Sequence, residues 1–145
     1  MTRPNYMKAR ALVELQPYIE KARTFSGWSF DELDVAHLDG RMPWDYEAIA
    51  RNAALKAQSI IDLGTGGGER FARIIDGAHA RCVATEEWVV NAPVANDRLR
   101  PVGAGVVRAD SLRLPFADSC VDLVLDRHEA LEPAEVARVL RPPAR

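Results

Sequence analysis

The chain has 145 residues, of which 48% are hydrophobic and 28% are charged, and this length and composition favour one globular domain over two independent ones. The same composition excludes collagen-like, low-complexity and disordered classes. Its 19 basic and 21 acidic residues leave a net charge of −2, which is too balanced for a general nucleic-acid binder.

The cysteine pattern and the apolar segments indicate a cytoplasmic protein. Cys82 and Cys120 lie far apart without a Cys-x-x-Cys spacing, so we expect reduced thiols and no metal site. Residues 1–18 mix charged side chains among the apolar ones, unlike the uninterrupted apolar region of an export signal. No segment approaches the roughly 20 apolar residues of a membrane span, so no membrane contact is expected.

The N-terminal part of the chain is predicted to be helical. Apolar residues at helical spacing predict an amphipathic helix over residues 6–25. Residues 28–43 are irregular and are expected to form a loop or cap with about one helical turn. Pro43 suits a helix start and is followed by acidic residues that favour the positive end of a helix dipole, so a second helix is predicted over residues 44–56.

After residue 57 short β-type segments alternate with helical ones, which is typical of a parallel sheet with crossover helices. The predicted fold class is α/β, a doubly wound parallel sheet with strand order 3-2-1-4. The ten residues between strands 3 and 4 must cross a diagonal of about 25 Å and reach only about 33 Å when extended, so no long helix fits there. Strands are predicted at residues 59–63, 81–86, 106–109 and 121–125, and helices at 69–76, 88–99 with an interruption at Pro93, and 133–140.

A glycine-rich loop follows the first predicted strand directly and opens the next helix. Backbone amides converge at such a position, and glycines let a ligand approach the main chain closely. The loop does not end in Lys followed by Ser or Thr, which argues against a Walker-type phosphate loop. The carboxylate of Asp62 at this point favours a cationic ligand and would repel a pyrophosphate. The alternative is a flexible turn that binds no ligand.

This loop resembles the first motif of class I S-adenosylmethionine-dependent methyltransferases, an acidic residue followed by Gly-x-Gly-x-Gly. The four motif positions are occupied here by Asp62, Gly64, Gly66 and Gly68. The resemblance covers about residues 44–140 and implies a Rossmann-like fold with S-adenosylmethionine as cofactor. It further implies that the loop, Thr65 included, lies against the methionine and ribose parts of the cofactor, and that the acidic residue helps to hold the methionine ammonium.

Glu86 ends the second predicted strand. In dinucleotide-binding folds a carboxylate roughly 20 residues after the last motif glycine binds the ribose hydroxyls, and Glu86 lies close to that separation. By the resemblance, Glu86 binds the ribose and Trp88 packs near the adenine. The alternatives are an exposed charge for Glu86 and simple core packing for Trp88. The resemblance also implies that Asp110 accepts the exocyclic amine of adenine and that Leu112 covers the ring, whereas Asp110 would otherwise only cap its loop. Asp122 is expected to be structural.

His128 and Glu129 follow the fourth strand, beyond whose carboxyl end ligands bind in open α/β sheets. The family places residues beside the methyl acceptor there, so these two are the candidate catalytic residues. The imidazole of His128 is a candidate for accepting the proton of an acceptor hydroxyl or amine. Because in-line methyl transfer gains mostly from holding the reactants together, a general base is not required. The alternative is that both residues only order the loop or screen Arg127.

The resemblance ends near Leu140, where the complete seven-stranded fold of the family would continue to a fifth strand. We therefore expect two units, an N-terminal helical cap or lid over residues 1–57 and an S-adenosylmethionine-binding domain over 58–145 that is incomplete at its C-terminus. Strand 4 would then be an edge through which the chain self-associates.

The expected function is methyl transfer from S-adenosylmethionine to a small-molecule acceptor, with no nucleic acid or membrane as partner. Trp28, Trp44 and Tyr46 are candidates for lining an acceptor pocket, with ordinary packing as the alternative. A second hypothesis is a truncated, catalytically inactive S-adenosylmethionine-binding protein that acts through a partner. The third, a nicotinamide-dependent oxidoreductase, ranks last because its Gly-x-Gly-x-x-Gly motif would need glycine where the chain has Glu69.

Overall fold

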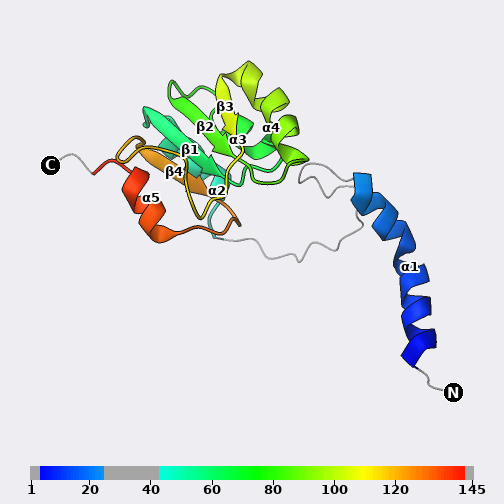
Figure 1. Ribbon diagram of the computed structural model, residues 1–145. Helices are drawn as coiled ribbons and strands as arrows, with labels where there is room; N and C mark the ends of the chain where they lie inside the picture. The colour runs from blue at the N-terminus through cyan, green and yellow to red at the C-terminus, as the bar shows by residue number, and fades with distance from the viewer. Residues whose placement is uncertain (1–3, 25–42, 143–145) are drawn as a thin grey trace.

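The computed structural model describes residues 4–24 and 43–142. Its four strands form one parallel sheet in the order β3-β2-β1-β4, which confirms the predicted α/β class and strand order (Figure 1). The elements in chain order are α1 (Pro4–Thr24), α2 (Tyr46–Ala54), β1 (Ser59–Leu63), α3 (Glu69–Ile74), β2 (Arg81–Thr85), α4 (Asn91–Leu99), the 3-10 turn η1 (Arg100–Val102), β3 (Ala104–Val107), β4 (Leu123–Asp126) and α5 (Pro133–Val139).

Strand β1 lies at the centre of this arrangement, paired with β2 on one side and with β4 on the other. All five of its residues are buried, as expected for a strand that is covered on both faces. The register sets Asp62 beside Ala84 and Leu63 beside Asp126, so the carboxyl ends of the three strands are level. The loops that follow β1, β2 and β4 therefore meet at one edge of the sheet, called the carboxyl edge below.

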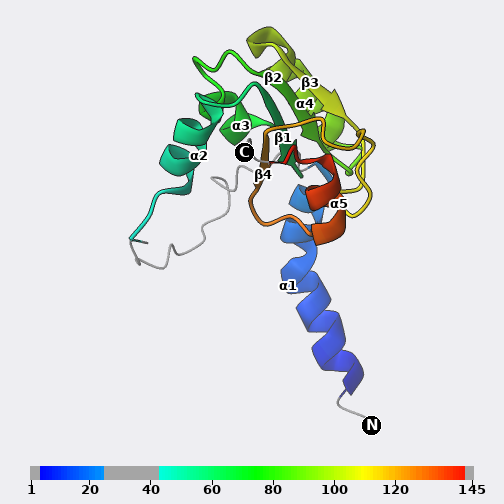
Figure 2. The ribbon, with the colours of Figure 1, turned by 90° about the vertical axis from the view of Figure 1, so that its left-hand side faces the viewer.

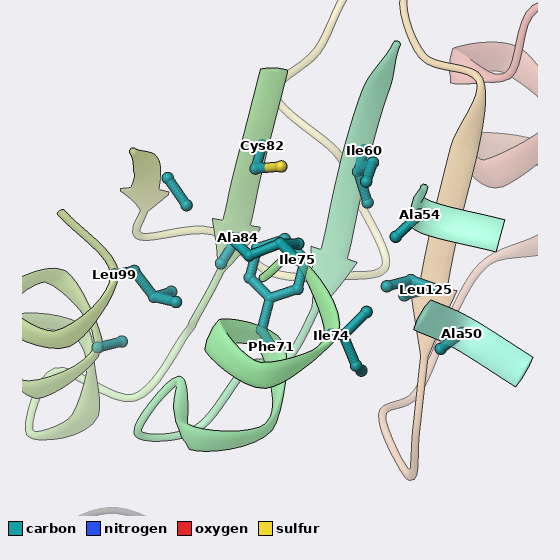
Figure 3. Packing of buried hydrophobic residues seen from close by; sticks show 12 residues of the cluster. Ala50, Ala54, Ile60, Phe71, Ile74, Ile75, Cys82, Ala84, Leu99 and Leu125 are labelled. Carbon is teal, nitrogen blue, oxygen red and sulfur yellow. The ribbon is translucent and has the colours of Figure 1, made fainter. Parts of the chain in front are cut away.

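Helices cover both faces of the sheet, and each face has its own apolar cluster. On one face Phe71 and Ile74 of α3 pack with Ala50 and Ala54 of α2 against Ile60 and its neighbours (Figure 3). On the other face α5 packs over β1 and β4, and Figure 2 shows it on the opposite side of these strands from α2 and α3. Helix α2 thus shares the core of the sheet although it precedes the boundary at residue 58 that the sequence led us to expect.

Several element boundaries differ from the prediction by one to three residues, helix α4 for example beginning at Asn91 and not at residue 88, and three differences have identifiable reasons. Helix α4 runs through Pro93 without interruption, because Pro93 lies in the first turn, where backbone N–H groups have no intrahelical partner. Strand β3 begins two residues earlier than expected, since Ala104 already pairs with Cys82. Strand β4 begins two residues later, because Val121 forms an isolated bridge to Leu140 instead.

The connection from β3 to β4 contains no helix, as the reach of the chain predicted. Arg138 of α5 fixes it by donating hydrogen bonds to the carbonyl oxygens of Leu114 and Phe116, at 3.0 and 2.7 Å. The loop expected over residues 28–43 lies, except for Pro43, outside the described residues. Within the described part, no helix is long and apolar enough to cross a membrane.

Candidate functional site

The glycine loop at the carboxyl end of β1 is fixed to the neighbouring strand. The Thr65 N–H donates to the carbonyl oxygen of Thr85 at 2.9 Å, and the Gly64 N–H donates to the Thr85 hydroxyl at 3.3 Å. The Gly68 N–H closes the turn onto the Thr65 carbonyl at 3.1 Å. These bonds give the loop one defined path, in contrast to the flexible turn considered as the alternative.

Two motif glycines are required by the backbone and by their neighbours. Gly64 and Gly68 have φ values of 57° and 78°, in the left-handed region that side-chain-bearing residues rarely adopt. A β-carbon at position 68 would lie 2.9 Å from Cγ of Leu99, so the absence of a side chain lets α4 approach the loop. A β-carbon at position 64 would overlap the carboxylate of Glu129.

A further residue that supports the loop was missed by the sequence analysis. Arg98 of α4 donates to the Gly67 carbonyl oxygen and to the Glu69 carboxylate, and so bridges the loop and the start of α3. Nothing in the sequence distinguishes Arg98 from other basic residues on predicted helices, because the contact spans about thirty residues and depends on how α4 packs.

Glu86 follows β2 and is buried, with only 6% of its surface exposed. Its two carboxylate oxygens accept the Gly66 N–H at 2.7 Å and the Trp88 N–H at 2.9 Å. Burial raises the pKa of Glu86 above its ordinary value, and these two hydrogen bonds oppose the rise. The alternative of an exposed charge is therefore wrong. Each oxygen keeps a second lone pair with which to accept a hydroxyl.

Asp62, the acidic residue of the motif, is also buried. Burial raises its pKa from 3.8 to about 7, and the nearby Asp126 carboxylate adds to the rise. The Thr65 side chain lies close enough to lower this pKa in part, yet its buried hydroxyl oxygen has no hydrogen-bond partner of good geometry among the described residues. A buried carboxyl that is poised to lose its proton near neutral pH is well suited to a cationic ligand.

The residues expected near an adenine ring lie at the same edge. The Ala109 N–H donates to the Glu86 carbonyl oxygen at 3.3 Å, which sets the following loop beside Glu86. Asp110 caps this loop by accepting the Leu112 N–H at 2.8 Å, as its alternative role anticipated. Trp88 and Leu112 are 44% and 49% exposed, so Trp88 is not a core residue. Both side chains leave apolar surface uncovered at this edge.

The loop after β4 brings both candidate catalytic residues to the carboxyl edge. The Glu129 N–H donates to Asp126 Oδ1, and the Ala130 N–H donates to Glu129 Oε1, each at 3.1 Å. His128 has a φ of 72°, an uncommon conformation for a residue with a side chain. His128 is exposed, whereas the Glu129 carboxylate lies directly over Gly64.

Tyr46 reaches the carboxyl edge from α2. Burial raises the pKa of its hydroxyl to about 12, and the carboxylates of Asp62 and Asp126 contribute to the rise. The hydroxyl oxygen is buried without a hydrogen-bond partner in the part of the chain that the structure describes. Of the other aromatic residues proposed for an acceptor pocket, Trp44 is exposed and Trp28 lies outside the described residues.

Within residues 4–24 and 43–142, no group of three or more His, Cys, Asp and Glu side chains is placed to hold a metal ion. Cys82 and Cys120 are free thiols, the first buried and the second half-buried. The groups described at the carboxyl edge are carboxyl groups, backbone N–H groups, the Tyr46 and Thr65 hydroxyls, the His128 imidazole and exposed apolar side chains.

Comparisons with known proteins agree with this geometry. A family model described as a methyltransferase domain matches residues 61–145, and no curated protein matches the sequence. A SAM-dependent methyltransferase from Aquifex aeolicus is similar with 22% identity and a TM-score of 0.55, over 68% of this chain and 60% of that one. The YcgJ protein from Bacillus subtilis is similar with 19% identity and a TM-score of 0.57, over 66% and 46%.

The [4+2]-cyclase SpnF is also similar, with 18% identity and a TM-score of 0.56, over 92% of this chain and 55% of that one. These likenesses show the fold. The aligned part corresponds to between 46% and 60% of the length of the three solved structures.

Proposed function

This chain belongs to the methyltransferase-domain family, and from that premise we propose that it binds S-adenosylmethionine and transfers the methyl group to a small-molecule acceptor. The observation that supports this most directly is the pair of buried carboxyl groups, Asp62 and Glu86, on either side of a glycine loop. No Lys or Arg of the described residues forms an ion pair with either of them. Buried carboxyls without a cationic partner are costly, so they favour a ligand that supplies one.

The residues present fit this cofactor. Gly64 and Gly68 give the loop the left-handed turns that set it between Asp62 and Glu86, and the buried Thr65 hydroxyl has no hydrogen-bond partner among the described residues. In the proposed complex Asp62 holds the methionine ammonium and Glu86 accepts the ribose hydroxyls. Both assignments place charge or hydrogen-bond acceptors where the ligand has donors.

The adenine would lie beyond Glu86, at the exposed side chains of Trp88 and Leu112. Apolar side chains left uncovered beside a polar site are the surfaces on which an aromatic ring gains most from burial. One oxygen of Asp110 already accepts the Leu112 N–H, so the other would accept the exocyclic amine.

When bound, the cofactor supplies an electrophilic methyl group on a sulfonium sulfur. The contribution of the chain is to hold the acceptor in line with that methyl group, and His128 would accept the proton that a hydroxyl or amine acceptor loses. His128 is exposed after β4, where an acceptor could reach it. The segment before β1 would act as a lid over this position, with the buried Tyr46 hydroxyl facing the acceptor.

A fold of this kind does not by itself fix the reaction, as the likeness to a [4+2]-cyclase illustrates. The alternative function is cofactor binding without methyl transfer, in which the chain acts through a partner. Strand β4 is an edge of the described sheet, and pairing of that edge with a second copy would be one route to such an assembly. Sedimentation velocity showing only monomer at high concentration would contradict this self-association.

The test is calorimetric titration of the protein with S-adenosylhomocysteine and with NAD, repeated with Asp62→Asn and Glu86→Gln. Binding of the first ligand but not of NAD, weakened in both variants, would support the proposal. A matched control is Asp76→Asn, which removes a carboxylate from an exposed ion pair with Arg51. Equal affinities in all variants would refute the site assignment, and binding without transfer to any acceptor would favour the alternative.

A further inference from the structure

Glu129 occupies a distinctive place at the carboxyl edge. Its carboxylate lies against the main chain of Gly64, in space that is free only because position 64 has no side chain. The backbone of Glu129 is held by Asp126, and its Oε1 accepts the N–H of Ala130. Glu129 is an exposed residue.

The charge of Glu129 has no cation to balance it. No Lys or Arg side chain of the described residues forms an ion pair with its carboxylate. The Glu129 charge helps to raise the pKa of Glu86, so the two carboxyl groups lie near each other. A negative charge beside other carboxyls is unfavourable in the free protein, and a positively charged ligand would relieve it.

The position of Gly64 identifies which part of the ligand would meet this charge. The following step depends on the proposed function, in which Asp62 takes the ammonium and Glu86 takes the ribose. In S-adenosylmethionine the sulfur lies between these two groups. Gly64 lies between Asp62 and Gly66, whose N–H is bound by Glu86. In the proposed complex the sulfur would therefore lie near Gly64, beside the Glu129 carboxylate.

We propose that Glu129 is a specificity-determining residue, the counter-charge by which this site prefers a sulfonium ligand over the neutral thioether. Methyl transfer returns the electron pair of the broken carbon–sulfur bond to sulfur, so the product has lost the positive charge that Glu129 attracts. The carboxylate then favours binding of the methyl donor and release of the thioether. This role uses charge alone and needs no proton transfer by Glu129.

The test compares the dissociation constants of S-adenosylmethionine and S-adenosylhomocysteine, measured by calorimetry without an acceptor, in the wild-type chain and in Glu129→Gln. The amide keeps the size and the oxygen that accepts the Ala130 N–H, and removes the charge. We expect the preference for the sulfonium over the thioether to fall about tenfold, mainly through weaker binding of S-adenosylmethionine. An unchanged preference, or an equal change for both ligands, would overturn the proposal.

Glu87→Gln is the matched control. Glu87 is an exposed neighbour whose charge also raises the pKa of Glu86, but its carboxylate does not lie over Gly64. Its removal should leave the preference within about twofold of wild type, and a fall as large as that in Glu129→Gln would show a general field effect instead.

A second measurement does not depend on the variants. Added salt should weaken the binding of S-adenosylmethionine to the wild-type chain more than the binding of S-adenosylhomocysteine, since salt screens the attraction between the sulfonium charge and the carboxylate. Equal salt dependence of the two ligands would count against the counter-charge. Absence of binding of either ligand to the wild-type chain would instead refute the proposed function.

Discussion

Carboxylates lie at both edges of this sheet, the carboxyl edge and the opposite edge where the strands begin, called the amino edge. They differ in whether a cation is paired with them. At the amino edge Asp122 accepts the N–H groups of Gln58 and Ser59, both at 2.9 Å, and it pairs with Arg141 at 2.6 Å. The Arg141 hydrogen bond lowers the pKa of Asp122, whereas burial raises the pKa values of Asp62 and Glu86 at the carboxyl edge. The carboxylate with a cationic partner stabilises the fold, whereas the proposed function assigns to a ligand the two that form no ion pair among the described residues.

The largest expected effect concerns Glu86→Gln at the carboxyl edge. Hydrogen bonds to a charged group contribute roughly 1.5–3 kcal/mol each, so loss of the charge should weaken S-adenosylhomocysteine binding about 100-fold. Calorimetric titration measures this. A loss smaller than about threefold would show that Glu86 only holds the Gly66 and Trp88 N–H groups.

The opposite pattern is expected for Asp122→Ala at the amino edge. This change leaves two backbone N–H groups and the Arg141 guanidinium without their acceptor, and should lower the free energy of unfolding by about 2 kcal/mol. Urea unfolding measures the loss. The dissociation constant for S-adenosylhomocysteine should stay within about twofold of wild type, and a larger change would erase the distinction between the two edges.

Ligand affinity at the carboxyl edge should depend on pH. A bound ammonium requires ionised Asp62, whose pKa is about 7 in the free protein, so ligand affinity should rise roughly tenfold from pH 6 to pH 8. Calorimetry at the two pH values tests this. In Asp62→Asn the affinity should be weaker and nearly independent of pH, and an unchanged slope in that variant would assign the titration to another group.

The titration of Asp62 should also make the stability of the free protein depend on pH. The folded state holds the Asp62 proton more tightly than the unfolded state, so this residue lowers stability as pH rises from about 4 to 7. Asp122 has a lowered pKa, so its contribution is present above pH 3.8 and is lost in more acidic solution. Thermal unfolding of Asp62→Asn should therefore show a flatter profile between pH 4 and 7, and a higher midpoint at pH 8.

The smallest effect is expected for Asp76→Asn, which removes an exposed carboxylate from its 3.3 Å ion pair with Arg51. Surface pairs of this kind contribute little because water and salt screen them, so the free energy of unfolding should change by less than about 0.5 kcal/mol. Urea unfolding checks this. A loss comparable to that of Asp122→Ala would show that an exposed ion pair without backbone N–H partners contributes as much as the contacts of Asp122.

The sequence by itself indicated the strand at residues 59–63 and the four motif positions from Asp62 to Gly68. These are local signals, because a continuous apolar segment followed by glycines is legible without knowing its neighbours. The reach of the chain between strands 3 and 4 is likewise fixed by residue count, and so is the absence of a helix there.

Only the tertiary structure decided the surroundings of the site. Three features of the site depend on how separate elements pack. They are the contact of Glu86 with the Gly66 N–H, the position of Tyr46 of α2 at the edge, and the position of Glu129 over Gly64. These contacts join residues that lie far apart in the sequence, and no local pattern encodes them. The sequence therefore determines where the charged residues lie along the chain. The packing of the elements around the sheet determines which of them form ion pairs and which do not.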